Sequence, residues 1–157
     1  MSKLEFKLKQ DPGLTQIIFS GQIDETFPPE LHKIEFGQTL SIDLQNVTAI
    51  NSLGIREWIK FIGHIGTINL EIFNCPKLFI DQVNMVQGFI PSPYSIKSFY
   101  VPYFNEEESL EKNVLFTFGK EYGTGPLKIN GSVTDEKGIR FEIDVIESKY
   151  FNFLKSS

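Results

Sequence analysis

The sequence predicts an α/β domain, with a mixed four- or five-stranded sheet and flanking helices, followed by a small β-rich C-terminal extension. Stretches typical of strands alternate with two stretches of helical apolar spacing, which favours a partly parallel sheet covered by helices. The 157 residues suffice for one hydrophobic core and a small satellite. The composition changes near Pro102, so we predict a domain over residues 1–101 and an extension over 102–157 that packs on it.

The first four predicted elements are a β-hairpin, a short helix and a strand. Apolar and charged residues alternate over 4–8, and Pro12-Gly13 supplies turn chemistry before the apolar stretch 17–19. Residues 30–34 suggest a short helix with proline in its first turn. Residues 39–44 alternate again and are β-branched, which predicts the next strand.

An amphipathic helix is predicted near residues 52–64. Its apolar residues fall at i, i+3, i+4 and i+7 and form one stripe: Ile55, Trp58, Ile59 and Ile62. We expect Ser52 to be its N-cap, since a serine hydroxyl accepts from the free amides of the first turn. We expect the Trp58 side chain in the core and Leu53 exposed at the helix start.

The remaining elements follow the same reasoning. Residues 68–72 predict a strand, 76–88 a second helix, and 96–101 a fifth strand. In the extension, 114–118 and 139–143 predict strands. The aromatic segment 150–154 is expected to dock on the body of the protein.

Charge and cysteine content exclude several classes of function. The net charge of −5 and scattered lysines argue against nucleic-acid binding, which needs a basic stripe. Cys75 is the single cysteine, so no disulfide can form within the chain. The N-terminus has no apolar signal-peptide core, and no stretch is long enough to span a membrane. We therefore expect a cytoplasmic protein.

The stretch Leu40–Ile55 resembles the signature of STAS domains, named for sulphate transporters and anti-sigma factor antagonists. The later Leu70–Pro76 also resembles the STAS strand that leads into the next helix, and the resemblance covers about residues 1–100. It implies a non-catalytic protein-interaction module of bacterial signalling. The implied partner is a protein such as an anti-sigma kinase or another signalling protein, with no cofactor, while the oligomeric state is left open.

In STAS domains the loop and helix start around this motif form the docking face. The resemblance therefore implies a set of partner-binding residues: Asn51, Ser52, Leu53, Gly54, Arg56 and Glu57. Leu53 stands where anti-sigma factor antagonists carry the phosphorylated Ser or Thr, so that switch is missing. Asn51 stands where an Asp is usual. Gly54 has no side chain, and we expect this to leave room at the helix start for the backbone of a partner to approach.

The extension resembles a zinc ribbon that has lost its metal. Residues 100–103 and 150–154 are similar to the flanks of such extensions in bacterial STAS-like proteins. The metal-binding cysteines would fall at four positions without a thiol: Asn105, Glu108, Thr134 and Lys137. We therefore expect no metal there, and packing to hold the extension.

Other candidate sites have simpler explanations. Ser52 could be a phosphoacceptor displaced by one residue along the chain, but its expected role as the N-cap of the helix explains it. His32, His64 and Cys75 lack ligand spacing for a metal or nucleophilic site. The glutamates at 106–108 could bind a hard cation, but a solvated acidic loop explains them. The alternative to an interaction module is a small-ligand-binding or enzymatic domain that uses a pocket between sheet and tail.

Overall fold

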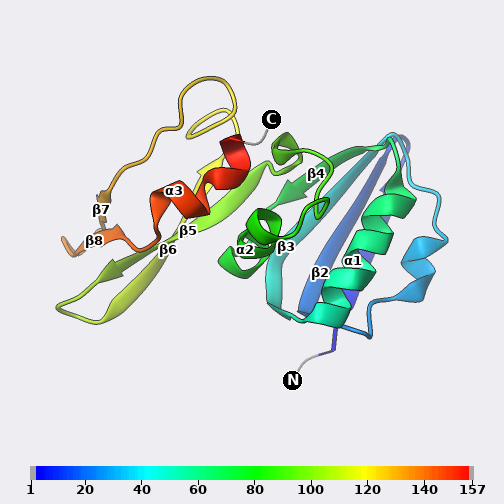
Figure 1. Cartoon of the computed structure of the whole chain (residues 1–157), viewed down its shortest axis with the longest axis horizontal. Coiled ribbons are helices and arrows are strands. Elements are labelled where there is room, and N and C mark those ends of the chain that lie inside the picture. The colour runs from blue at the N-terminus through cyan, green and yellow to red at the C-terminus, as the bar shows by residue number, and fades with distance from the viewer. Residues whose placement is uncertain (1–2, 156–157) are drawn as a thin grey trace.

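The computed structural model describes residues 3–155 and contains two β-sheets side by side (Figure 1). The first sheet holds β1 (Glu5–Asp11), β2 (Leu14–Ile23), β3 (Thr39–Ile50) and β4 (Asn69–Phe73), in that spatial order. β1 is antiparallel to β2, whereas β2, β3 and β4 are mutually parallel. The prediction of a mixed sheet is confirmed, with four strands.

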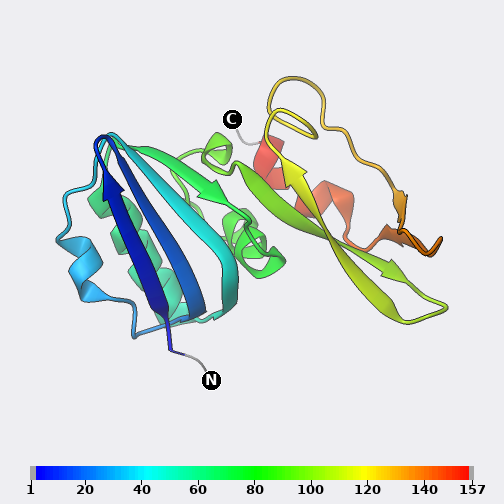
Figure 2. The ribbon, with the colours of Figure 1, turned by 180° about the vertical axis from the view of Figure 1, so that it is seen from behind.

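Helices cover one face of this sheet, and no described helix covers the other face (Figures 1 and 2). The short 3-10 helix η1 (Pro29–His32) lies between β2 and β3, α1 (Ser52–Ile65) connects β3 to β4, and α2 (Lys77–Met85) follows β4. Both predicted helices are confirmed, although α2 ends three residues before position 88. Within residues 3–155, no helix is both long enough and apolar enough to cross a membrane.

Aromatic rings fill the space between α1 and the sheet. Trp58 is fully buried, as predicted, and its indole N–H donates to the carbonyl of Phe89 at 2.8 Å. The ring of Phe79 meets Trp58 edge-on at 5.1 Å, and Phe61 lies 5.7 Å away. Edge-to-face contacts of this kind add to the free energy gained by burying the rings.

The second sheet is antiparallel throughout and confirms the predicted β-rich extension. Its spatial order is β6 (Leu110–Thr117), β5 (Ser98–Asn105), β8 (Arg140–Ile143) and β7 (Ser132–Thr134). The fifth strand that we predicted at 96–101 is β5, and its ladder partners β6 and β8 belong to this second sheet. The predicted boundary between residues 101 and 102 therefore falls inside β5.

Backbone hydrogen bonds join the two sheets where β4 ends and β5 begins. Isolated parallel bridges connect Ile72 with Ile96 and Cys75 with Phe99. The Cys75 N–H donates to the Ser98 carbonyl at 3.1 Å, and the Tyr100 N–H donates to the Cys75 carbonyl at 2.8 Å. The second sheet is thus fixed to the first by main-chain contacts.

The C-terminal segment docks on the body of the protein, as predicted: it packs on the second sheet, and Asn84 of α2 donates to the Tyr150 carbonyl at 2.9 Å. It forms α3 (Glu147–Tyr150) and the 3-10 helix η3 (Asn152–Lys155), and it buries Phe151. The Phe99 ring of β5 lies at the centre of this half, with five aromatic rings at 5.2–6.2 Å from its centroid: Phe116, Tyr122, Tyr150, Phe151 and Phe153. Aromatic packing therefore holds the extension.

Tyrosine hydroxyls add hydrogen bonds to this packing. Tyr122 donates to the Ile96 carbonyl at 2.6 Å, and Tyr150 donates to the carbonyl of Tyr100. Burial raises the pKa of both hydroxyls above the ordinary value near 10, and nearby acidic groups raise each pKa further. Both tyrosines therefore remain protonated in the folded chain well beyond pH 10.

We expect the protein to lose stability in alkali because of these two tyrosines. The pKa of each tyrosine is higher in the folded chain than in the unfolded chain, so each contributes to the free energy of unfolding. This contribution is fully present below about pH 10 and falls by about 1.4 kcal/mol per pH unit above it, for each tyrosine. Thermal unfolding of the double variant Tyr122→Phe/Tyr150→Phe should show a shallower decline between about pH 10 and 11.5. The exposed Tyr94→Phe serves as control; equal slopes in the wild type and the double variant would contradict this assignment.

Candidate functional site

The start of α1 is capped by Asn51, and the prediction that Ser52 is the cap was wrong. Asn51 has an extended backbone, and its Oδ1 accepts from the N–H of Gly54 at 2.8 Å. Ser52 is the first residue within the helix, and its side chain is exposed. Both residue types are good caps, so the sequence alone placed the cap one residue too late.

Gly54 holds the helix start against the end of β2. A Cβ built on Gly54 would overlap the carbonyl group of Ile23 and would lie 2.8 Å from the backbone nitrogen of Asp24. The N–H of Asn51 also donates to the Ile23 carbonyl, at 3.1 Å. The backbone that approaches Gly54 is therefore the chain's own, not a partner's, which corrects our expectation. Gly54 is buried and cannot be a contact residue.

Five residues of α1 form an exposed face, which we call the α1 surface: Ser52, Leu53, Arg56, Ile59 and Lys60. Leu53 is 44% exposed, as predicted, and it projects from the first turn. Sequence reasoning missed Ile59 and Lys60. Their spacing of seven residues from Ser52 and Leu53 was the signal, because positions i and i+7 lie on one side of a helix.

The α1 surface is apolar at two positions and cationic at two others. Arg56 and Lys60 lie between Leu53 and Ile59 around the helix, at intervals of three or four residues. Glu57 lies beside this face, 3.8 Å from the ammonium of Lys60, in a surface pair worth less than about 1 kcal/mol. Of the six predicted residues, Ser52, Leu53 and Arg56 belong to the surface, while Asn51 and Gly54 support it from behind.

The two histidines and the cysteine have structural partners. The ring of His32 packs 5.7 Å from Phe27, and His64 Nε2 makes a hydrogen bond with the Ile34 carbonyl at 3.1 Å. Cys75 is fully buried, and burial raises its thiol pKa, which opposes formation of the nucleophilic thiolate. Across the described residues 3–155, no three His, Cys, Asp or Glu side chains are grouped so that they could hold a metal ion.

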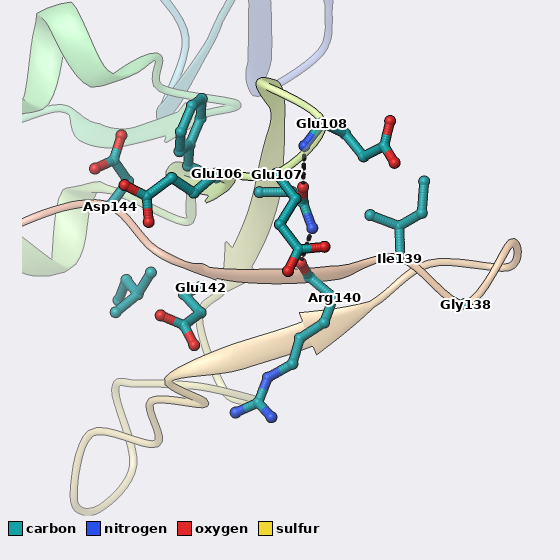
Figure 3. Close-up of a pocket in the computed structure, with 11 residues that line it drawn as sticks. Glu106, Glu107, Glu108, Gly138, Ile139, Arg140, Glu142 and Asp144 are labelled. Carbon is teal, nitrogen blue, oxygen red and sulfur yellow. Dashed lines mark hydrogen bonds between the residues drawn. The ribbon is translucent and has the colours of Figure 1, made fainter.

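An acidic cleft of about 730 Å³ lies at the far end of the second sheet (Figure 3). Glu106, Glu107 and Glu108 form the β5–β6 turn, while Glu142 and Asp144 come from β8 and the segment after it. Figure 3 shows the guanidinium of Arg140, which also lines the cleft, turned away from the three glutamates of the turn. The side chains at 106–108 are exposed, as expected for a solvated loop.

Three of the four positions that align with the zinc ligands of a ribbon form hydrogen bonds in the turns of this sheet: Asn105, Glu108 and Lys137. Asn105 Oδ1 accepts from the N–H of Glu108 at 2.7 Å, and Asn105 Nδ2 donates to the carbonyl of Arg140 at 2.7 Å. In the other turn, the N–H of Lys137 donates to Asp135 Oδ1 at 2.9 Å. Amide and carboxylate side chains thus hold the two turns by direct hydrogen bonds.

A second hollow, of about 670 Å³, lies between the loop after α2 and the C-terminal segment. Its walls are residues 83–93 on one side and Asn152 and Phe153 on the other. The alternative hypothesis places its pocket between the sheet and the tail. This hollow lies instead between the tail and the end of α2 with the loop after it, and none of its lining residues belongs to a strand.

No protein-family model matches the chain, and neither does any curated protein. The resemblance to STAS domains and to a zinc ribbon therefore stays a prediction from the residues quoted above. The geometry at the start of α1 and the two hollows are the observations on which a function can be argued.

Proposed function

We propose that the chain is a non-catalytic protein-interaction module of STAS type, which docks a signalling protein on the α1 surface. The observation that carries this proposal is Leu53, a large apolar side chain left 44% exposed at the first turn of a helix. Exposed apolar groups ringed by polar ones favour a partner surface. Ser52, Arg56 and Lys60 supply that polar ring.

The support beneath Leu53 is held by a helix cap and by a close backbone contact, which favours docking. The cap by Asn51 and the close approach of Gly54 to Ile23 fix the first turn on both sides of Leu53. A preformed surface loses little conformational entropy when a partner binds, so more of the contact energy appears as affinity. The order strand, strand, strand, helix, strand, helix over the first 85 residues also agrees with the STAS resemblance.

The chemistry of the α1 surface defines the partner that we propose. The partner supplies an apolar pocket for Leu53 and carboxylates for Arg56 and Lys60. Since Leu53 has no hydroxyl, phosphorylation at this position cannot control binding. We therefore propose a constitutive interaction with a bacterial signalling protein, of the anti-sigma kinase class or another.

Leu53→Asp should weaken partner binding at least tenfold without unfolding the domain. Burying a leucine contributes about 2 kcal/mol, and the new carboxylate would have to be desolvated at the interface. The helix should persist, because an acidic residue in the first turn suits the helix dipole. The measurement is affinity capture with mass spectrometry to identify the partner, then titration of that partner against each variant, with circular dichroism for folding.

Leu110→Asp is a matched control. Leu110 is 43% exposed, nearly the same as Leu53, but it lies on β6 of the second sheet. If both variants bind like the wild type, the α1 surface is not the docking site. If Ser52 is found phosphorylated in cells, the constitutive mode of binding is wrong.

The alternative function makes a different prediction. A small ligand in the hollow beside Phe153 would raise the unfolding temperature of the protein in a metabolite screen, since a ligand that binds only the folded state stabilises it. Leu53→Asp would leave that shift unchanged. The two functions are therefore separable with the same pair of variants.

A further inference from the structure

The face of the first sheet opposite α1 is covered by no helix of the described chain, and we call it the open face (Figure 2). Alternate residues of each strand point to this face, in keeping with the period of two along a strand. They line a shallow hollow of about 550 Å³ that reaches across all four strands. Ile18 of β2 lies in the middle of it and is 41% exposed.

Charge is distributed unevenly across the open face. The strand register aligns Lys9, Gln16, Ser41 and Glu71 in one row, which runs from edge to edge of the sheet. A cation thus occupies the β1 edge of the row, while a carboxylate occupies the β4 edge. Three strand spacings separate Lys9 from Glu71, about 14 Å, so the two cannot pair within one chain. Lys9 has a weak exposed contact with Asp11, at 3.9 Å.

We propose that a second copy of this chain docks face to face on the open face, about a two-fold axis parallel to the strands. An axis of this kind between β2 and β3 places β4 of the second copy over β1 of the first. Each row of residues then faces the same row of the other copy, in reversed order. Lys9 of each copy then faces Glu71 of the other. Twisted sheets pack in this aligned manner with their mean strand directions about 30° apart, so the axis bisects the two directions and is only approximately parallel to either.

The contacts along this row are self-complementary. Glu71 meets Lys9 twice, once on each side of the axis, and Gln16 meets Ser41 in the middle. Each of the two charged pairs joins a positive and a negative side chain. Both central side chains, Gln16 and Ser41, can donate and accept hydrogen bonds. The charge pattern of the open face therefore fits a second copy of the same face.

The next row adds apolar area to the same interface. The register aligns Lys7, Ile18, Asp43 and Phe73 across the sheet. The two-fold axis places the aliphatic stem of Lys7 against the Phe73 ring of the other copy, and Ile18 beside Asp43. Lys7 and Asp43 of opposite copies become diagonal neighbours twice, and these two attractions outnumber the single diagonal contact between the two Asp43 carboxylates across the axis.

The size of the open face indicates a weak dimer. Four strands at about 4.8 Å spacing, over the five residues along which β4 pairs, at about 3.3 Å each, give a projected face of about 320 Å² per chain. A standard stable interface buries about 800 Å² per partner. The open face is smaller than a standard interface, so we expect a dimer that forms in a concentration-dependent manner.

The test is sedimentation equilibrium of the full chain up to about 0.5 mM, a range that covers micromolar affinities. The wild type should approach twice its mass of 18.0 kDa. Lys9→Glu and Glu71→Lys should each weaken dimerisation at least tenfold, because each creates two like-charge contacts. An equimolar mixture of the two variants should recover a dimer, since both edge contacts between a Lys9→Glu chain and a Glu71→Lys chain join opposite charges.

Three outcomes would overturn the proposal. The first is a wild type that remains a monomer throughout the range. The second is a dimer that Glu71→Lys leaves intact, which would indicate pairing through the free edge of β1 instead. The third is a mixture that sediments like the separate variants. Circular dichroism of each variant guards against unfolding, and the test is independent of binding at Leu53.

Discussion

The Gly54→Ala variant is expected to fail to fold, or to lose more than about 4 kcal/mol of stability. The new Cβ would overlap the carbonyl of Ile23 and would lie 2.8 Å from the backbone nitrogen of Asp24. Both obstacles are main chain, so no side-chain rotation relieves them. The first turn of α1 would have to leave β2, which breaks the hydrogen bond from Asn51 to Ile23 and exposes the core beneath.

Gly63→Ala is the matched control on the same helix. Its added Cβ meets nothing within 4 Å. Alanine has the higher helix propensity, so this variant should gain up to about 1 kcal/mol. Urea unfolding followed by circular dichroism measures both. A Gly54→Ala protein as stable as the wild type would show that the helix start does not lie against Ile23 as described.

The Phe99→Ala variant is expected to lose about 3–5 kcal/mol, the usual cost of deleting a buried phenylalanine and leaving a cavity. The Phe99 ring is fully buried and contacts aromatic rings from β6, from the loop after it and from the C-terminal segment. Its backbone also forms the bridge with Cys75. Removing this ring should therefore loosen both the second sheet and its joint with the first.

Phe118→Ala provides the comparison for this variant. Phe118 is only partly buried, and its ring contacts Tyr94, Tyr122 and the ammonium of Lys97. Its removal should cost clearly less than that of Phe99. Chemical denaturation and hydrogen exchange of the second-sheet amides measure the difference. Equal losses in the two variants would contradict a core centred on Phe99.

The sequence allowed most elements of the first half to be predicted. The alternation over 4–8 and the Pro12-Gly13 turn indicated the hairpin, because register and turn chemistry are local properties. Helical spacing around Trp58 indicated α1 for the same reason. The partners of β5 could not be predicted, since alternation shows that a stretch is a strand but not which ladder it joins. The strand β7 was missed because Ser132–Thr134 is short and carries little apolar pattern.

At the candidate site, the sequence identified the right segment but not the role of each residue. Leu53 was correctly expected to be exposed, because it falls outside the apolar stripe of the helix. The sequence led us to place the helix cap at Ser52, one residue after the true cap, Asn51. Asparagine and serine have nearly the same preference for the cap position, so the sequence could not decide between them. The function of Gly54 depends on Ile23, a residue far away in sequence, so only the fold could show it. Ile59 was counted in the stripe, yet it is 37% exposed at its margin.

The order of the strands also bears on how the chain folds as it leaves the ribosome. Each strand of the first sheet pairs with its neighbour in sequence, so all its ladders can close once residue 73 has emerged. β5 must wait much longer for β8, since Phe104 pairs with Glu142, and Phe153 arrives later still. We expect the first sheet to form during synthesis. The apolar side chains of β5 would meanwhile be open to chaperones until the C-terminal aromatic segment closes over Phe99.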